Sequence, residues 1–345
     1  MASSEPQRLL VVGPSWVGDM VMAQSLLMTL QQRSPAALID VVAPKWSGDL
    51  LGRMVEVNDY IEMPLAQGQV ELGVRYRLGK SLRTRGYDQA IIIPRSWKSA
   101  VVPAAAKIPQ RTGYRGEMRY GLLNDIRPLD KGVLTQTVQR YVALGLPADA
   151  PLPPATISQP HLTVDPENQA ALMARLALDG DAPVVGLMPG AEYGPAKCWP
   201  IEYYGELANR LIADGYQVWL FGSPKDRPSC AGIAAIAPQV VDLSGKTALV
   251  DVVDLIAYCK FVVCNDSGLM HIAAATGRHV VALYGSSTPV YTPPLTSSAE
   301  VCYLGLACSP CFERECPLRD PAAQLGCLTG ITVDSVFDRC RKVQW

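Results

Sequence analysis

Short runs of apolar residues alternate with helical patterns along this chain, and this alternation predicts an α/β fold. Residues 9–13 (LLVVG) have the composition of a buried strand, and the stretch that follows repeats apolar residues every three or four positions, as one face of a helix does. The predicted strands of the first half are 9–13, 39–43 and 90–94, and its predicted helices are 19–30 and 75–85. Strands that alternate with helices are typical of a parallel sheet covered on both faces.

The second half repeats this pattern after a proline-rich stretch. Residues 146–161 (LPADAPLPPATISQPH) contain five prolines and no sustained periodicity, which is typical of a linker between domains. The predicted strands beyond it are 184–188, 217–221, 261–264 and 280–283, and the predicted helices are 166–178, 201–211, 226–236, 249–258 and one that begins at Asp266 or Ser267. We expect the strand at 280–283 to close the sheet. Two α/β domains follow, residues 1–155 and 165–345.

Composition supports a soluble globular protein with two cores. A chain of 345 residues, 49% of them hydrophobic and 18% charged, is long enough for two domains and is not disordered. No apolar run approaches the roughly 18 residues of a membrane-spanning helix. The opening MASSEPQR lacks the apolar stretch of a secretory signal, so we expect a cytoplasmic protein. Several of the ten cysteines stand singly in apolar segments, as reduced core thiols do: Cys230, Cys259 and Cys264.

Basic residues are concentrated between Arg75 and Arg127, where twelve of them accompany three acidic residues. A segment with this charge can meet phosphorylated lipid, a membrane surface or nucleic acid, or can form a solvated basic face. No aromatic stacking motif accompanies the charge, which argues against nucleic acid.

The candidate chemistry begins where the predicted strand 184–188 ends, in the stretch VVGLMPGAEYGPAKCWP (184–200). Pro189 and Gly190 end the strand, and the loop after them carries Glu192 and Lys197 before an amphipathic helix begins. Ligands of open α/β sheets bind at the carboxyl ends of the strands. A glycine-rich turn with one lysine suits an anion, because backbone N–H groups and an ammonium can both face it.

A second junction of this kind follows the predicted strand 261–264, in the sequence NDSGLMHIAAA. A helix that opens at Asp266, Ser267 and Gly268 offers free N–H groups and the positive end of its dipole to a phosphate, and His271 lies one turn further on. A capping motif followed by a packed histidine is the plainer alternative. Two such junctions in one domain can together hold a diphosphate.

The first strand leads through PSWVGD to Asp19, at the start of the first predicted helix. The spacing of Gly13 and Gly18 is not that of a GxGxxG dinucleotide site, and no Gly-Lys-Ser/Thr follows. Gly245-Lys246-Thr247 looks like the end of a Walker A motif, but Val240 occupies the place of its first glycine. Asp19 is therefore either a helix acid favoured by the dipole or a residue that carries chemistry.

Three of these stretches together resemble the ADP-heptose:lipopolysaccharide heptosyltransferases: PSWVGDM (14–20), MPGAEYGPAKCWP (188–200) and NDSGLMHIAAA (265–275). The likeness covers nearly the whole chain in order. It implies the GT-B fold, in which two Rossmann-like domains with parallel sheets face each other across an interdomain cleft. The acceptor would bind the domain of residues 1–155, and the nucleotide-sugar donor that of residues 165–345.

The resemblance implies an inverting, metal-independent transfer of L-glycero-D-manno-heptose from ADP-heptose, without a cofactor. The acceptor it favours is the first heptose of the lipopolysaccharide inner core, Hep-Kdo2-lipid A. Family members that act on other core acceptors are alternatives within the class, and a nucleotide-sugar epimerase on the same architecture is an alternative outside it. A third alternative is a basic protein that binds anionic lipid and catalyses no reaction.

Residue roles carry over where the motifs match. Asp19 takes the place of the family's general base, and Lys197 that of the lysine that contacts the donor phosphate. The donor-binding positions are Gly190, Ala191, Glu192, Thr247, Asp266, Ser267, Gly268, Leu269 and His271, with no metal ligand. A glutamate that bonds the donor ribose in some relatives is replaced here by Pro224 or its neighbours.

These residue types suit the reaction. Negative charge grows on the leaving diphosphate, and Lys197 with the helix end at Ser267 can neutralise it. Asp19 can take the proton of the attacking hydroxyl, and closure of the domains would exclude water. Some of the basic residues between Arg75 and Arg127 would contact the lipid A–Kdo–heptose acceptor, with the protein peripheral at the inner face of the cytoplasmic membrane.

Two possible metal sites are weaker. Asp179-Gly180-Asp181 matches the DxD pattern of metal-dependent glycosyltransferases, but no supporting residues surround it. The four cysteines near the carboxyl end suit reduced thiols in a packed loop better than a zinc site or a disulfide, because only one close CxxC pair is present: Cys308, Cys311, Cys316 and Cys327.

Overall fold

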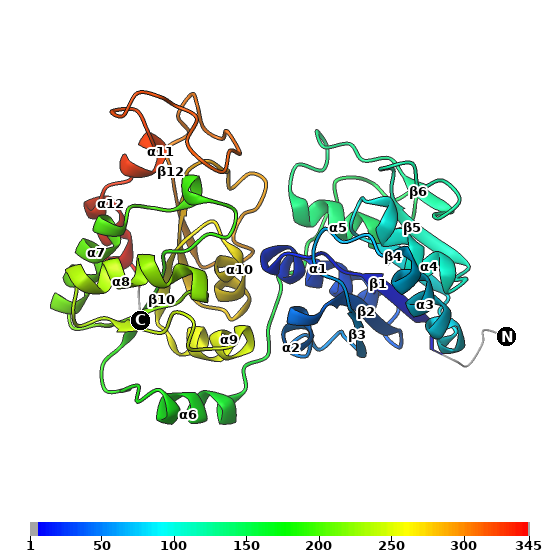
Figure 1. Ribbon diagram of the computed structural model, residues 1–345, viewed down its shortest axis with the longest axis horizontal. Helices are drawn as coiled ribbons and strands as arrows, with labels where there is room; N and C mark the ends of the chain where they lie inside the picture. Colours follow the sequence, from blue (N-terminus) through cyan, green and yellow to red (C-terminus); the bar gives the residue numbers. More distant parts are fainter. Residues whose placement is uncertain (1–5, 344–345) are drawn as a thin grey trace. The chain divides into compact units, whose positions relative to one another are not determined.

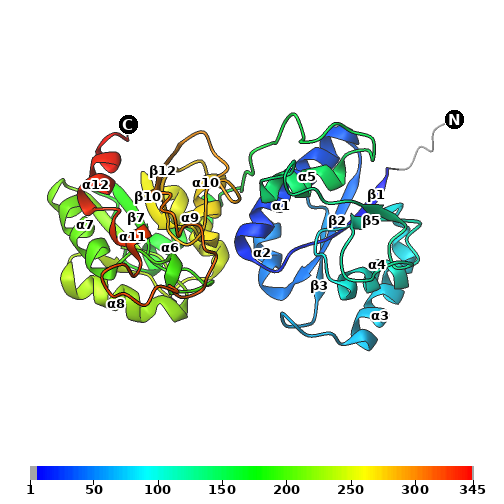
Figure 2. The ribbon, with the colours of Figure 1, turned by 90° about the horizontal axis from the view of Figure 1, so that it is seen from above.

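The computed structural model describes residues 6–343, and the chain divides between Pro160 and His161 into two compact units (Figure 1). Each unit is built around one six-stranded sheet in which every pairing is parallel. The boundary falls inside the proline-rich stretch 146–161. Helices lie on both faces of each sheet, as Figures 1 and 2 show, so each sheet is buried between two layers.

The amino-terminal unit has the strand order β3-β2-β1-β4-β5-β6. Its strands are β1 (Arg8–Val12), β2 (Leu38–Pro44), β3 (Asp59–Met63), β4 (Gln89–Ile92), β5 (Gln110–Tyr114) and β6 (Asp125–Arg127). Its helices are α1 (Val17–Arg33), α2 (Gly48–Leu51), α3 (Leu72–Ser81), α4 (Val101–Ala105) and α5 (Thr137–Gly145), and 3-10 turns span Lys45–Ser47, Leu82–Arg85 and Trp97–Ala100.

The carboxyl-terminal unit has the equivalent order β12-β11-β10-β7-β8-β9. Its strands are β7 (Val184–Met188), β8 (Gln217–Leu220), β9 (Val241–Asp242), β10 (Phe261–Asn265), β11 (His279–Tyr284) and β12 (Ala299–Tyr303). Its helices are α6 (Pro166–Arg175), α7 (Ile201–Ala213), α8 (Arg227–Ile236), α9 (Leu249–Tyr258), α10 (Gly268–Ala275), α11 (Gly326–Thr329) and α12 (Val333–Arg341), and 3-10 turns span Pro195–Lys197 and Pro224–Asp226.

The central strands are the continuous apolar runs of the sequence. All five residues of β7 and of β10 are buried, as expected for strands covered on both faces. In each sheet the chain moves outward in one direction from the first strand, then returns to the other side of it, so the direction reverses between β1 and β4 and between β7 and β10. Such reversals leave a crevice at the carboxyl ends of the two strands, where open α/β folds bind ligands.

The observed elements follow the predicted ones with some differences. The strand at 280–283 does not close the sheet, because β12 pairs with β11 on its outer side. Only Cys302 of the five residues of β12 is buried, so this edge strand has neither a continuous apolar run nor a clear alternation to mark it in the sequence. Helix α1 begins at Val17, before Asp19, and the predicted helix 75–85 ends as a 3-10 turn after Ser81.

Within residues 6–343, no helix combines the length and the apolar character needed to cross a bilayer. This agrees with the absence of a long apolar run in the sequence.

Helices α3 and α4 approach each other at Gly79, where a glycine is required. A Cβ on Gly79 would lie 2.4 Å from the carbonyl oxygen of Val102 and 2.6 Å from the Cβ of Ala105. Gly73, on the same helix, is exposed, and a Cβ there would meet only the flexible end of Arg77. A methyl group added at Gly79 should therefore cost more stability than one added at Gly73.

We expect Gly79→Ala to destabilise the protein by about 1–3 kcal/mol, because the added methyl forces two helices apart. Gly73→Ala should leave stability unchanged or raise it by up to about 1 kcal/mol, because alanine favours the helix. Thermal unfolding followed by circular dichroism compares the two variants. A Gly79→Ala protein as stable as Gly73→Ala would contradict the packing described.

Candidate functional site

The carboxyl-terminal unit gathers its polar residues at the ends of β7 and β10, where the sheet changes direction. The loop after β7 carries Lys197 in the short turn Pro195–Lys197, and β10 runs directly into Asp266 and helix α10. The two strands are paired, with Val185 opposite Phe261, so their carboxyl ends lie side by side. The two junctions predicted from the sequence thus meet at one edge of one sheet.

Lys197 and Asp266 form the central contact of this edge. Lys197 Nζ lies 2.6 Å from Asp266 Oδ2, and both side chains are largely buried, with 18% and 5% of their surfaces exposed. The ammonium also lies 5.4 Å from the ring centroid of Tyr193, and Thr292 Oγ1 donates to Asp266 Oδ1 at 3.4 Å. A partly buried ion pair of this kind holds a cation at a fixed place, ready for an anionic ligand.

Asn265, the last residue of β10, fixes the geometry behind this pair. Its side chain is fully buried, and its Oδ1 accepts from the backbone N–H of Trp199 at 3.1 Å and from the hydroxyl of Tyr204 at 3.2 Å. Its Nδ2 donates to the carbonyl oxygen of Pro189 at 2.7 Å. One amide side chain therefore bonds to both ends of the loop that carries Lys197.

Ser267 is the N-cap of α10, but its side chain makes no capping hydrogen bond. Its hydroxyl is buried and has no hydrogen-bond partner among the residues described. A cap residue usually satisfies one of the free N–H groups of the first turn. The hydroxyl and the first-turn amides of α10, including those of Gly268 and Leu269, therefore form a donor set that fits the oxygens of a phosphate. Of the two residues predicted to begin this helix, Ser267 is the N-cap residue, and Asp266 pairs with Lys197 instead.

His271 lies one turn into α10 with only 4% of its surface exposed. Burial lowers the pKa of His271 to about 4, and the Lys197 ammonium lowers it further while the Asp266 carboxylate opposes this. The imidazole is therefore neutral near pH 7.

The remaining predicted residues of the donor site lie around this centre. Gly190 follows β7, and a Cβ there would lie 2.2 Å from Asp226 Oδ1, so only glycine allows this approach. Glu192 pairs with Lys225 in the turn after β8. Ala191 is half-buried in the same loop as Gly190, and Thr247 is half-buried in the turn before α9.

The turn Pro224–Asp226 occupies the place where some relatives carry the ribose-binding glutamate. Asp226 Oδ2 accepts from the backbone N–H and the hydroxyl of Ser223, both at 2.7 Å, and this closes a capping box. The turn therefore presents Lys225, paired with Glu192, and a carboxylate already bonded to its own turn.

A third segment, the loop after β11, lies at this edge and was not predicted from the sequence. Ser286 and Ser287 are buried there, and within residues 6–343 neither hydroxyl has a hydrogen-bond partner. The backbone N–H of Ser286 donates to the carbonyl oxygen of Ala196, next to Lys197, at 3.3 Å. The signal in the sequence was a run of small hydroxyl residues, GSST, directly after a buried strand.

A fourth segment, from Phe312 to Arg314, supports the lysine loop from the other side. Tyr193 donates from its hydroxyl to the carbonyl oxygen of Phe312 at 2.6 Å, and Arg314 Nε donates to the carbonyl oxygen of Tyr193 at 2.8 Å. The N–H of Ala196 donates to the carbonyl oxygen of Arg314 at 3.0 Å. This segment lies between Cys311 and Cys316, in what we call the cysteine-bearing loop. The sequence did not indicate that this loop contacts the lysine loop.

In the amino-terminal unit, Asp19 occupies the equivalent place after the first central strand. It lies in the first turn of α1, beyond the carboxyl end of β1, where the strand order of the sheet reverses between β1 and β4. Tyr141 of α5 donates from its hydroxyl to Asp19 Oδ1 at 3.0 Å. Burial and the neighbouring Asp19 carboxylate raise the pKa of Tyr141, so the tyrosine remains a hydrogen-bond donor.

The basic segment from Arg75 to Arg127 is only partly a surface. Arg75 and Arg119 are buried, with 7% and 2% of their surfaces exposed, and their guanidinium groups donate to backbone carbonyls such as those of Val70 and Pro94. Arg83, Arg111 and Arg127 are likewise bonded within the unit, and Arg85 pairs with Asp40 at 2.9 Å. Exposed basic residues remain at Arg77, Lys80, Arg95, Lys107 and Arg115.

All ten cysteines are free thiols. Among the residues described, no three of the types His, Cys, Asp and Glu are grouped so that they could hold a metal ion. Asp179, of the DxD pattern, accepts from the backbone N–H of Asp181 at 2.9 Å and so closes a surface turn.

The sequence of residues 75–321 matches the model of glycosyltransferase family 9, described as heptosyltransferases, and the chain belongs to this family. The protein is therefore a glycosyltransferase. The family resemblance noted in the three motifs is confirmed.

Two curated relatives and one solved structure give the likeness in detail. The chain is 51% identical over 303 residues to lipopolysaccharide heptosyltransferase 2 of Escherichia coli K12, covering 85% of this chain and 87% of the relative. It is 51% identical over 305 residues to lipooligosaccharide heptosyltransferase 2 of Haemophilus influenzae, with the same two coverages. The structure of E. coli ADP-heptose lipopolysaccharide heptosyltransferase II matches with a TM-score of 0.86 and 44% identity, covering 98% of both chains. The predicted GT-B fold class is confirmed by this match.

The buried His271 predicts a pH dependence of stability. Its pKa is about 4 when folded and near 6.5 when unfolded, so the unfolded chain takes up the proton first. The stability contributed by the neutral imidazole is complete above about pH 6.5 and is lost as the pH falls toward 4. Between pH 7 and pH 5 we expect this histidine alone to account for a loss of about 2 kcal/mol.

Urea unfolding at pH 7 and pH 5, followed by tryptophan fluorescence, measures this loss. His271→Gln should lose about 2 kcal/mol less than the unaltered protein over this range, because glutamine does not titrate. His161→Gln, the same substitution at an exposed histidine, serves as the control and should keep the original dependence. Equal pH dependence in all three proteins would contradict the assignment.

Proposed function

We propose that this protein transfers L-glycero-D-manno-heptose from ADP-heptose to the first heptose of the lipopolysaccharide inner core, Hep-Kdo2-lipid A, as heptosyltransferase II. The observation that carries the proposal is the identity of 51% to a lipopolysaccharide heptosyltransferase 2 over 85% of this chain. The name of the matching solved structure, an ADP-heptose heptosyltransferase, supports the donor. The site at β7 and β10 supports it independently, because its free donors and its cation suit a diphosphate.

In this proposal the carboxyl-terminal unit binds the leaving group. The diphosphate gains negative charge as the bond to the anomeric carbon breaks, and donors fixed in advance stabilise that charge best. Lys197, held by Asp266, supplies the positive charge. The unpartnered hydroxyl of Ser267 and the first-turn amides of α10 supply hydrogen bonds. With this set the reaction needs no divalent metal and no cofactor.

Asp19 acts as the general base in the proposed reaction. The acceptor hydroxyl attacks the anomeric carbon from the face opposite the diphosphate, which inverts its configuration, and passes its proton to the carboxylate. The hydrogen bond from Tyr141 to one carboxylate oxygen orients the group. The tyrosine keeps its own proton, because burial and Asp19 raise its pKa.

The proposal includes peripheral contact with the inner face of the cytoplasmic membrane, where a lipid-linked acceptor would be embedded. Exposed apolar side chains next to basic residues support it: 90% of the surface of Met118 and 66% of that of Tyr120 are exposed, near Arg115. Such a mixture suits an anionic lipid surface.

We expect the purified protein to add one heptose to Hep-Kdo2-lipid A in the presence of ADP-heptose, with one ADP released per heptose transferred. The product is measured by mass spectrometry and the ADP by a coupled assay. The rate should be the same with excess EDTA, because Lys197 and α10 take the place of a metal.

Three outcomes would contradict the proposal in different ways. Transfer to Kdo2-lipid A or to a later core heptose would indicate heptosyltransferase I or III. Conversion of the donor sugar without an acceptor would indicate an epimerase. A rate abolished by EDTA and restored by a divalent ion would refute the metal-independent mechanism.

Substitution of the two proposed catalytic residues should affect different quantities, kcat for Asp19 and ADP affinity for Lys197. Asp19→Ala should lower kcat by about 100-fold or more while ADP binding, measured by calorimetry, stays within about twofold. Lys197→Gln should weaken ADP binding by about tenfold or more, because a charged hydrogen bond to the diphosphate is lost. Tyr141→Phe should also lower kcat, by a smaller factor than Asp19→Ala, with ADP binding kept.

Unfolding of each variant is measured alongside, since Lys197→Gln leaves Asp266 buried without its partner. Near-normal turnover by Asp19→Ala would remove Asp19 from the mechanism. Unchanged ADP affinity in a folded Lys197→Gln protein would remove Lys197 from the donor site.

A further inference from the structure

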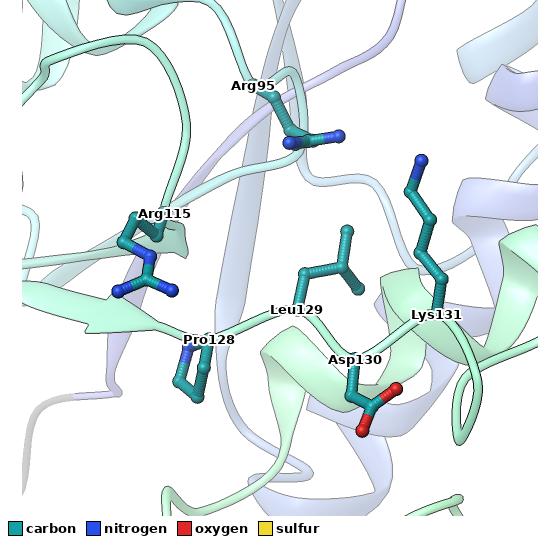
Figure 3. Close-up of a pocket in the computed structure, with 6 residues that line it drawn as sticks. All are labelled: Arg95, Arg115, Pro128, Leu129, Asp130 and Lys131. Carbon is teal, nitrogen blue, oxygen red and sulfur yellow. The ribbon is translucent and has the colours of Figure 1, made fainter.

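A second polar cavity lies in the amino-terminal unit, at the carboxyl ends of β4, β5 and β6. It has a volume of about 570 Å³ and is lined by Arg95, Arg115, Pro128, Leu129, Asp130 and Lys131 (Figure 3). Arg95 follows β4, Arg115 follows β5, and residues 128–131 follow β6. Three separate strand ends therefore contribute one cation each to the same pocket.

The residues that line this pocket include three cations and one acid, so its charge is positive. Among the described residues, neither Arg95 nor Arg115 nor Lys131 forms an ion pair. The carboxylate of Asp130 points away from the Lys131 ammonium in Figure 3, and its Oδ1 accepts from the backbone N–H groups of Gly132 and Val133. Three cations thus face the cavity, and its one acid is bonded to its own turn.

The backbone that carries these cations is held in place. The N–H of Arg115 donates to the carbonyl oxygen of Arg127 at 2.7 Å, which joins the ends of β5 and β6. Gly116 allows the chain to pass close to Arg95, since a Cβ there would lie 2.4 Å from the Arg95 carbonyl oxygen. The buried Arg119 guanidinium donates to the carbonyl oxygens of Pro94 and Tyr114 and so fixes both loops from below. The pocket is therefore a preformed site.

The positive charge of Arg95 affects the pKa of Arg119. Burial lowers the pKa of Arg119 to about 10, and the Arg95 guanidinium adds to this lowering. An anion in the pocket would relieve the repulsion between these two groups.

We propose that this pocket binds an oxyanion, a phosphate or a carboxylate, carried by the saccharide of the acceptor. The inference rests on the proposed function and names the part of the acceptor that this site recognises. Guanidinium groups bind both kinds of oxyanion through paired hydrogen bonds, and three of the six lining residues are cations. Pro128 and Leu129 add an apolar surface against which a sugar ring packs.

The position of the pocket favours the acceptor over the donor. β4, whose end carries Arg95, pairs with β1, whose end leads into α1 and Asp19. The pocket and the proposed general base therefore lie at the same edge of one sheet. An acceptor held by its anionic group in the pocket can present a hydroxyl toward Asp19.

The test removes two charges in the pocket and compares the result with the same loss outside it. In Arg95→Gln/Arg115→Gln we expect the KM for the acceptor to rise by about 10- to 100-fold, with kcat and the KM for ADP-heptose within about twofold. The control, Arg77→Gln/Lys80→Gln, removes two exposed charges from α3 and should change none of these by more than about twofold. Thermal unfolding verifies that both variants fold.

A binding experiment gives a result that does not depend on turnover. The deacylated acceptor saccharide is titrated into each protein by calorimetry, as isolated and after enzymatic removal of its phosphates. If a phosphate occupies the pocket, dephosphorylation removes the difference between the unaltered protein and Arg95→Gln/Arg115→Gln. If a carboxylate occupies it, the difference survives dephosphorylation and disappears when the carboxyl groups are reduced.

Three results would overturn the inference. Equal weakening of acceptor binding in both double variants would show that the positive charge of the whole surface, and not this pocket, attracts the acceptor. A loss confined to kcat or to the KM for the donor would place these arginines elsewhere in the reaction. Loss of binding to phosphatidylglycerol vesicles with normal saccharide binding would assign the pocket to the membrane. Absence of heptose transfer by the unaltered protein would refute the proposed function alone, because the calorimetric comparison still tests the pocket.

Discussion

The ion pair between Lys197 and Asp266 is the constraint around which the carboxyl-terminal unit is arranged. A carboxylate that is only 5% exposed needs a partner, because an unpaired buried charge costs several kcal/mol. The partner comes from another strand end, so the loop after β7 has to return to the end of β10. Asn265 enforces this return by bonding to Pro189 and to Trp199, at the two ends of the loop. The cation is thus placed by packing and hydrogen bonds before any ligand arrives, as a preorganised site requires.

The same sheet topology serves both halves of the molecule. Each half begins its sheet with a central strand, extends it to one side, and then returns to the other side. The chain therefore produces the same kind of crevice twice, once beside Asp19 and once beside Lys197. The residues placed there differ in charge: a carboxylate with a tyrosine donor in the first half, and an ammonium with unpartnered hydroxyls in the second. One architecture supports two kinds of chemistry because the strand ends, and not the strands, carry the functional residues.

Much of the fold could be predicted from the sequence, because the central strands are continuous apolar runs bounded by glycine, proline or helical patterns. β7 and α9 have the predicted bounds, and β10 and α7 differ only by a residue or two. Short edge elements such as β9 and β12 were missed, since two to five partly exposed residues carry little periodicity. The site was predictable where one loop holds the whole motif, as at Lys197 and Ser267. It was not predictable where the contact joins distant segments, as for Tyr141 with Asp19 or Thr292 with Asp266, because spacing along the chain says nothing about such pairs.

The hydrogen bonds between the lysine loop and residues 312–314 have a consequence for the order in which the protein matures. Tyr193 and Ala196 emerge from the ribosome more than a hundred residues before the partners that hold them, Phe312 and Arg314. A nascent chain that ends after α10 therefore contains both residues of the ion pair, Lys197 and Asp266, but not the segment that donates to and accepts from the loop of Lys197. The loop that carries Lys197 therefore gains its full set of hydrogen bonds only after residues 312–314 have been made and have folded against it.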